Sequence, residues 1–517
     1  MSPENLEARI EILPVPPGNY GGLFAGEGKL IYQRFPNTGS PQGGNSALFI
    51  YDFDKREEKT LLANATAFAI SADGKSMLAR EPRGFGIVKL NPDQKIEKVL
   101  PTADMEMILQ PREEWKQIFN DTWRRYRDFF YDPSMHKVDW DAIRKQYGAL
   151  VDNAITRWDV NNIQQEMISE LSAGHTYAGG GDLEQARNRT NGFLGVDWTV
   201  DNHAYKIKRI VHGAKWDNEV RSPFEFTGVN VKEGDYILSV NGRELKEGID
   251  PYAPFEGLAG KAVALRVNDK PGTEGSRMVV VKTMTQGEEA RLRHLEWIEG
   301  NRKKVEELSG GKLGYMYMPN TGGLGQTELM RQFYAQIDKE GFVIDERFNA
   351  GGQLADRFIE MLNRPVLYNI AWRNAEVTVW PVKGNNGPKV MLINGWAGSG
   401  GDAFPWAFQQ LKLGPIIGER TLGILVGPAT GHGLIDGGFI TVPDARLYGA
   451  DGKWFAEGYG IKPEIEIWDD PAQLAKGTDP QLVRAIEEAM KLVKSNPRVL
   501  HPRPPFEDRR AQGIKGF

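Results

Sequence analysis

A serine among small residues follows a short apolar run near residue 390, and it is the chain's best candidate for a nucleophile. The run Val390–Ile393 has the length and composition of a buried strand, and the segment 403–411 can form a helix. Glycines flank Ser399 in the turn between them, which lets a substrate come close. At a helix start, free backbone N–H groups favour negative charge. Ser399 is therefore a candidate nucleophile, while a simple helix N-cap stays open as the alternative.

Two further glycine-rich loops follow predicted strands in the same region. An acyl-transfer site needs a base, a group that orients the base, and two donors for an oxyanion. The N–H groups of Gly400 and of the Gly351–Gly352 turn can supply those donors. The third loop begins at Glu457. Two glycines in a strand-to-helix turn are common, so Gly351 and Gly352 carry little weight by themselves.

Histidine is scarce in this sequence, with seven residues in all, so candidates for a general base are few. His175 follows a helical pattern over 160–171, and Gly174 before it fits a helix C-cap. A histidine just past a helix end can be a cation that favours the helix dipole, or it can serve a functional role. The local pattern leaves both interpretations open.

The elements that must position these residues form the C-terminal part of the chain, from 285 to 517. Strand patterns near 313–318, 341–346, 390–393, 416, 439–442 and 465–467 alternate with helical patterns over 326–338, 353–362 and 479–494. Alternation of this kind predicts a layered α/β domain.

The first 104 residues predict β-structure with an internal repeat. Gly28 and Gly74 stand 46 positions apart in similar turns, close to the period of a β-propeller blade. The charged run 55–59 fits a solvated hairpin turn. There is material for about two blades, whereas a closed propeller needs about four to eight. Because open blades expose edge strands, we expect the chain to be the C-terminal part of a longer protein, or its blades to be completed by another subunit.

Residues 105–190 predict a small helical domain. Aromatic and apolar residues over 115–130 recur at three- and four-residue spacing, and two further helical patterns cover 140–151 and 160–171. The aromatic stripe is far more typical of a core than of a cofactor site.

Residues 191–284 predict a separate β-rich unit that resembles a PDZ domain. It has a glycine-containing loop at 192–196 and the sequence Gly-Asp-Tyr-Ile-Leu-Ser-Val-Asn-Gly at 234–242. The resemblance implies a groove in which a peptide adds as a strand. A spacer that only packs beside the next domain is the alternative.

Composition excludes several classes of site. The net charge is −5 with acids and bases interspersed, so no basic surface for nucleic acid is indicated. No apolar run is long enough for a transmembrane helix, and the N-terminus lacks the pattern of a signal peptide. The chain has no cysteine, which excludes disulfides and thiolate metal sites. We expect no cofactor, no metal, no nucleic-acid or membrane partner, and a cytoplasmic location.

Taken together, the order of these segments resembles the tail-specific and tricorn serine peptidases. The resemblance rests on a helical segment with His175, a PDZ-like unit, Arg-x-Asn-x-Gly-Gly at 347–352, Ala-Gly-Ser-x-Gly-Asp at 397–402, and Glu-Gly-x-Gly-x-x-Pro at 457–463. The tricorn branch fits best, because blade-like segments precede the helices. The implied fold is a multidomain α+β protein with partial propeller blades, a helical domain, a PDZ-like domain and a crotonase-like ββα-spiral catalytic domain.

The resemblance also implies a role for each site residue: Ser399 as nucleophile, His175 as general base, Glu457 as orienting acid, and the N–H groups of Gly400 and Gly351 as the oxyanion hole. One position departs from the tricorn pattern. A serine precedes the histidine there and links it to the glutamate, whereas this chain has Gly174. Glu457 must then reach His175 directly or through water, and we favour water because glycine would leave a polar space.

The sequence thus predicts a serine peptidase that acts on oligopeptides or unfolded segments, with homo-oligomerisation left open. A peptide-binding protein that uses the PDZ-like groove without cutting is the alternative. A crotonase-type acyl-CoA enzyme is disfavoured, since that family has no use for a PDZ insertion. His432 is the one rival base, although its neighbours resemble a family segment that is not catalytic.

Overall fold

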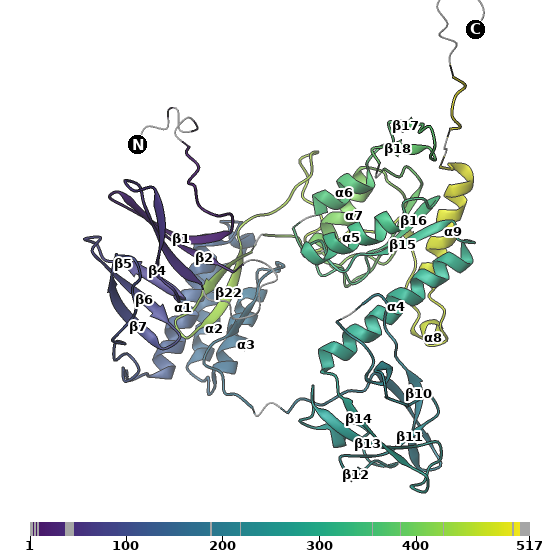
Figure 1. Ribbon diagram of the computed structural model, residues 1–517, viewed down its shortest axis with the longest axis horizontal. Coiled ribbons are helices and arrows are strands. Elements are labelled where there is room, and N and C mark those ends of the chain that lie inside the picture. The colour runs from purple at the N-terminus through teal and green to yellow at the C-terminus, as the bar shows by residue number, and fades with distance from the viewer. Residues whose placement is uncertain are drawn as a thin grey trace, which may run out of the picture. The chain divides into compact units, whose positions relative to one another are not determined.

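Two antiparallel sheets form the first part of the chain (Figure 1). The structure is a computed structural model, and it describes all residues except 1–3, 5–6, 8–9, 37–45, 187–188, 218, 354, 383, 428, 499–500 and 507–517. Contacts between Cα atoms divide the chain into two compact units, Met1–Gln110 and Pro111–Phe517. The first unit therefore ends just before the first helix, slightly later than the boundary at 104 that the sequence suggested.

Each sheet of the first unit is a meander of adjacent hairpins. The first has the order β1-β2-β3-β4 and the second the order β5-β6-β7. Apolar residues from both sheets share one core. The interpretation of these sheets as part of a propeller stays a prediction. The strands are β1 (Asn19–Gly26), β2 (Lys29–Phe35), β3 (Ala47–Asp52), β4 (Glu57–Leu62), β5 (Ala67–Ile70), β6 (Ser76–Glu81) and β7 (Gly84–Lys89).

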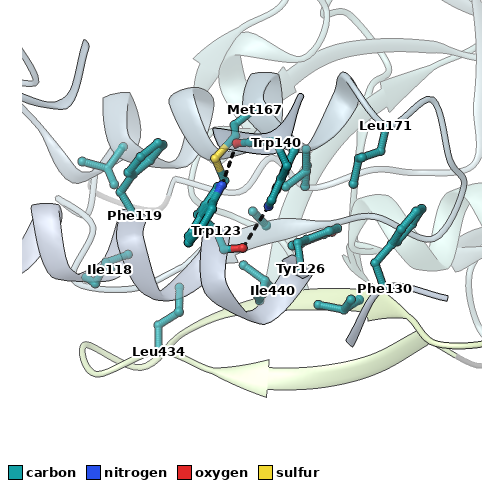
Figure 2. Close-up of a cluster of buried hydrophobic side chains, with 14 of the residues drawn as sticks. Ile118, Phe119, Trp123, Tyr126, Phe130, Trp140, Met167, Leu171, Leu434 and Ile440 are labelled. Carbon is teal, nitrogen blue, oxygen red and sulfur yellow. Dashed lines mark hydrogen bonds between the residues drawn. The ribbon is translucent and has the colours of Figure 1, made fainter. Parts of the chain in front are cut away.

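The second unit begins with three helices, α1 (Pro111–Phe129), α2 (Trp140–Val151) and α3 (Arg157–Ser169). Side chains cap two of the helix starts: Asp139 accepts from the Ala142 N–H, and Thr156 and Asp159 form a capping box. The predicted aromatic stripe of α1 is buried in the core between the helices (Figure 2). There the indole N–H groups of Trp123 and Trp140 donate to each other's backbone carbonyl, at 2.8 and 3.1 Å.

A hairpin from far along the chain completes this helical core. Strands β21 (Ala429–Gly433) and β22 (Gly438–Pro443) pair with each other, and β22 also pairs with β8 (Ala178–Gly180). Leu434 and Ile440 from the hairpin pack against the aromatic side chains of α1 (Figure 2). The helical region and the C-terminal region therefore share a core, and Thr441 of β22 binds the backbone of His175 beside it.

The PDZ-like unit is an antiparallel sheet with the order β14-β13-β11-β10-β9 and with β12 paired to β11. As predicted, Asn241 and Gly242 form the tight turn between β11 and β12, both at positive φ. Its strands are β9 (Val196–Asp201), β10 (Ala204–Ile210), β11 (Tyr236–Val240), β12 (Arg243–Glu244), β13 (Ala262–Asn268) and β14 (Arg277–Lys282).

A parallel sheet with the order β15-β16-β19-β20-β23 forms the centre of the C-terminal region. Every residue of its first three strands is buried, because helices cover both faces. Helices α5 (Gly323–Ala335), α6 (Ala355–Leu362) and α7 (Gly400–Gln410) cover one face, and α4 (Gln286–Leu308) and α9 (Pro480–Ser495) cover the other. The strands are β15 (Leu313–Tyr317), β16 (Gly341–Asp345), β19 (Lys389–Ile393), β20 (Ile416–Gly418) and β23 (Ile465–Glu466), with a separate hairpin of β17 (Tyr368–Ile370) and β18 (Thr378–Trp380).

The helices of this region agree with the predicted alternation, with two additions, the long α4 and the short α8 (Pro471–Leu474). They are α4 (Gln286–Leu308), α5 (Gly323–Ala335), α6 (Ala355–Leu362), α7 (Gly400–Gln410), α8 (Pro471–Leu474) and α9 (Pro480–Ser495). Helix α4 was not predicted. No helix among the described residues, the 23-residue α4 included, combines the length and apolarity needed to cross a membrane. The layered α/β arrangement agrees with the prediction, and the finer crotonase-like spiral stays one.

Candidate active site

Ser399 lies in the turn between β19 and α7, where the sequence placed it. It occupies the N-cap position of α7 with φ 60° and ψ −115°, a conformation that costs a non-glycine residue about 1–3 kcal/mol. Its N–H donates to Asp402 Oδ2 at 2.9 Å. Strained backbone of this kind is typical of functional sites.

A second turn, after β16, packs directly on the Ser399 turn. Gly351 has φ +81°, and a Cβ placed on it would lie 2.7 Å from Ser399 Cβ and 3.2 Å from Ser399 Oγ. Only glycine allows so close an approach. The Gly351 N–H donates to Asn349 Oδ1 at 2.8 Å, so this predicted oxyanion donor already has a partner within its own turn.

Gly400, the other predicted donor, is the first residue of α7. Its N–H is one of the first four of the helix, which have no carbonyl partner inside it. A Cβ on Gly400 would lie 1.9 Å from Thr321 Oγ1 and 2.4 Å from the Gly352 carbonyl oxygen. The Ser399 turn and the Gly351–Gly352 turn therefore meet through backbone atoms on two sides.

Asp402 connects the Ser399 turn to the segment 421–424 through hydrogen bonds. This role was not predicted from the sequence. Its carboxylate is fully buried and accepts from the N–H groups of Ser399, Gly423 and Ile424 and from the hydroxyl of Thr421. Burial raises the pKa of Asp402, and these hydrogen bonds oppose that rise. The spacing Ser-x-x-Asp at a helix start could have indicated this role.

His175 lies in the loop after α3, with φ 54°. Helix α3 ends at Ser169 with Glu170 as its C-cap, so the prediction of Gly174 as the C-cap was wrong. The Thr441 hydroxyl of β22 donates to the His175 carbonyl at 2.6 Å and fixes the loop to the hairpin. Burial lowers the pKa of His175, while the charges of Glu457 and Asp402 and a backbone contact at Val426 oppose this.

Glu457 binds the segment next to His175 through backbone groups. Its side chain is buried, with Oε1 accepting from the Gly174 N–H and Oε2 from the Leu425 N–H, each at 2.6 Å. The residue before it, Ala456, has a positive φ of 63°. The carboxylate therefore holds the backbone immediately before His175.

The space beside Gly174 is apolar. A Cβ placed on Gly174 would lie 2.4 Å from Ile424 Cγ2 and 3.1 Å from Ile424 Cα. The polar space for water that we expected beside Gly174 is therefore not there, because the Ile424 side chain fills it. A serine at 174 would require Ile424 to move.

His432, the rival base, lies on β21 against helix α1. Its ring is 5.2 Å from the ring of Phe129, and burial lowers its pKa together with the charge of Arg125. The carboxylates that act on it are Asp444 and Asp121. None of these neighbours belongs to the loops that surround Ser399.

Comparisons with known proteins agree on one family. The tricorn protease C1 domain model matches residues 111–169, the tricorn protease PDZ domain model 192–286, and the peptidase family S41 model 312–467. Tricorn protease homolog 1 of Streptomyces coelicolor is 30% identical over 520 residues, which cover 96% of this chain and 48% of that protein. A crystal structure of the tricorn protease superposes with a TM-score of 0.81 and 27% identity, and covers 93% of this chain and 47% of that one.

The chain carries the C1 and PDZ domains of tricorn proteases and a domain of peptidase family S41. This confirms the resemblance drawn from the sequence. The tricorn protease of Thermoplasma acidophilum is likewise 27% identical over 509 residues, covering 96% of this chain and 46% of that protein. The chain spans about half the length of the curated relatives it matches.

The tricorn-type PDZ domain of this chain uses part of its loop for internal contacts. The Phe193 N–H donates to the Met284 carbonyl at 2.9 Å. Arg293 of α4 donates to the carbonyl of Val196, the first residue of β9, at 2.9 Å. Strand β9 ends the sheet, so addition of a peptide there stays a prediction, with α4 contacting one end of that strand.

Proposed function

We propose that this tricorn-type chain is a serine peptidase that hydrolyses peptide bonds through an acyl-enzyme. Ser399 is the nucleophile and His175 the general base. The observation that carries the proposal is the strained backbone of the Ser399 turn. The Gly351 turn packs against it, and the Asp402 carboxylate binds both the Ser399 N–H and the N–H of Ile424, which contacts Gly174. A serine held in this way is positioned for reaction rather than for a cap alone.

The reaction follows from these assignments. Ser399 Oγ attacks the carbonyl carbon of the peptide bond while neutral His175 takes the hydroxyl proton. The tetrahedral oxyanion accepts hydrogen bonds from the Gly400 N–H and the Gly351 N–H. The Gly351 N–H then donates to both the oxyanion and Asn349 Oδ1. Collapse expels the amine, which takes the proton from His175. Water, deprotonated by His175, then attacks the ester carbonyl. The second tetrahedral intermediate releases the carboxylic acid product by breaking its bond to Ser399 Oγ, which takes the proton back from His175.

The environment of His175 suits a base. Burial lowers its pKa, so the imidazole stays neutral to lower pH than an ordinary histidine with a pKa of about 6.5. The nearby charge of Glu457 opposes that effect and stabilises the imidazolium formed during reaction.

Glu457 orients His175 through the backbone in this proposal. Its bond to the Gly174 N–H fixes the residue before the imidazole, while its bond to the Leu425 N–H fixes the carboxylate itself. This replaces the direct or water-mediated contact with the imidazole that the family comparison suggested.

We expect Glu457→Gln to be milder than loss of the base. Glutamine keeps one acceptor oxygen, but its NH₂ group cannot accept a hydrogen bond. Either the Gly174 or the Leu425 N–H therefore loses its partner, and one charge-assisted hydrogen bond worth about 1.5–3 kcal/mol is lost. The expected fall in kcat/KM is about 10- to 100-fold, measured on a fluorogenic peptide. Full activity would mean that the acid is only structural, and a loss equal to that of His175→Ala would favour direct contact with the imidazole.

Oligopeptides or unfolded segments are the proposed substrates. The Ser399 turn and the His175 loop come from separate segments that pack together through Asp402 and Glu457. Extended chains enter such a site more readily than folded ones. Homo-oligomerisation and a cytoplasmic location are further parts of the proposal.

A fluorophosphonate probe tests the proposal against a peptide-binding protein that does not cut. We expect one covalent adduct, found by mass spectrometry on the peptide that contains Ser399, and none on the Ser399→Ala variant. An adduct on another serine would contradict the nucleophile assignment. Peptide binding without any adduct would favour the binding protein.

A further inference from the structure

A buried carboxyl group lies just before the Gly351 turn of the candidate site in the sequence. Glu346 directly follows β16, and its side chain is 0% exposed. Neither of its carboxyl oxygens has a hydrogen-bond partner among the described residues. A buried carboxylate left in this state is costly, so the group must be neutral or paired.

Glu346 is adjacent to the side chain that holds the Gly351 turn. The Asn349 N–H donates to the Glu346 carbonyl at 3.1 Å, and Asn349 Oδ1 accepts from the Gly351 N–H at 2.8 Å. Asn349 Nδ2 is buried and forms no hydrogen bond among the described residues. The Asn349 amide is nevertheless close enough to the Glu346 carboxyl to lower its pKa. A neutral carboxyl group offers an acceptor for this amide and one O–H donor.

Three other titratable groups interact electrostatically with the Glu346 carboxyl, each from a different element. They are Asp402 of α7, Asp345 of β16 and Tyr317 of β15. Burial, followed by the charges of Asp402 and Asp345, raises the pKa of Glu346 well above its usual value, and Asn349 opposes this.

Hydrogen-bond donors are distributed unequally among the three carboxyl groups of Glu346, Asp345 and Asp402. Asp345 forms a two-point ion pair with Arg347, at 2.9 and 2.7 Å, and accepts from the Tyr315 hydroxyl at 2.8 Å. Asp402 accepts from three backbone N–H groups and one hydroxyl. Both carboxyl groups therefore have several hydrogen-bond donors, whereas the Glu346 carboxyl has no hydrogen bond among the described residues and only the Asn349 amide beside it.

We propose that Glu346 is a positioning residue of the active site that works as a neutral acid. Its carboxyl group is near enough to interact with Asn349, which accepts from the Gly351 N–H, and with Asp402, which accepts from the Ser399 N–H. A neutral Glu346 allows Asn349 to keep its hydrogen bond to the Gly351 N–H and Asp402 to keep its hydrogen bond to the Ser399 N–H. Ionised, it would place a second negative charge beside Asp402 and push apart the two turns that meet at Ser399. The inference rests on the proposed function of these turns.

The first test is the pH dependence of thermal unfolding in Glu346→Gln, followed in the full chain. A group whose pKa is higher in the folded state stabilises below its unfolded pKa, and that stability is lost as pH rises toward the folded pKa. The wild type should therefore lose Tm relative to Glu346→Gln as pH rises above about 4.5, by on the order of 2 °C per pH unit.

The matched control is Glu360→Gln, because Glu360 lies exposed on α6. We expect no pH-dependent difference in Tm between Glu360→Gln and the wild type. If Glu346→Gln also shows none, Glu346 is not held neutral and the proposal is wrong. This measurement needs no peptidase activity, so it decides the protonation state even if the proposed function fails.

The second test separates positioning from simple filling of space. Leucine has a similar volume but cannot accept from Asn349, whereas glutamine can. We expect Glu346→Leu to lower kcat about tenfold, the cost of about one hydrogen bond, with KM little changed, and Glu346→Gln to restore most of kcat. Equal kcat values for the wild type and both variants would overturn the positioning role. Should Glu346→Leu fail to fold, a loss of kcat in Glu346→Gln as large as tenfold would overturn it instead.

Discussion

Replacing Ser399 by alanine should lower kcat by on the order of 10⁴–10⁶-fold, the usual cost of removing a nucleophilic serine. Ser399 supplies the attacking oxygen in the proposed mechanism, so its loss would leave only stabilisation of the oxyanion by backbone N–H groups. The fold should survive. Alanine has the same Cβ at φ 60° as serine, and the Ser399 N–H still donates to Asp402. Hydrolysis of a fluorogenic peptide and thermal unfolding measure the two effects.

Ser495→Ala is the matched control, since Ser495 lies exposed at the end of α9. It should leave both kcat and Tm unchanged. Peptidase activity of Ser399→Ala within tenfold of the wild type would rule out Ser399 as the nucleophile. A loss of activity accompanied by a large fall in Tm would indicate a structural role for Ser399.

Replacing His175 by alanine should lower kcat/KM about 10²–10⁴-fold, the typical contribution of a positioned base. The base works when neutral, so activity of the wild type should rise with pH through the His175 pKa and then level off. Because burial lowers that pKa, the acid limb of kcat/KM should lie below about 6.5. A pH profile on a peptide substrate measures this limb.

His432→Ala provides the comparison for this assignment. Its ring packs near Phe129 of α1, so its removal should cost some stability but little activity. If His432→Ala were the more damaging change in kcat/KM, the base would be His432 and not His175. An acid limb well above pH 6.5 would also contradict the buried, neutral state assigned to His175.

Local patterns in the sequence determined much of the architecture. The apolar run at 390–393 became the fully buried strand β19, and the small residues after it became the turn that holds Ser399. The Asn241-Gly242 turn and the aromatic face of α1 also formed where predicted. Such features depend on residues a few positions apart, and periodicity and turn chemistry report on that range.

Helix α4 shows where a local pattern is too weak. Its buried residues are few and widely spaced, two glycines interrupt it, and charged side chains occupy much of its surface. Intrinsic periodicity therefore does not reveal it. Packing against the PDZ-like unit, through Leu292, and against the parallel sheet, through Val305, stabilises this helix.

Only the tertiary structure decided how the candidate site residues are held. Residue types and family order indicated Ser399, His175 and Glu457, but not that Glu457 binds the Gly174 N–H across 283 positions of sequence. Nor did they indicate that Ile424 fills the space beside Gly174. These contacts depend on how distant loops pack. The buried proton that we propose for Glu346 has the same origin, because a carboxyl group is neutral or charged according to the donors and charges that the fold places around it.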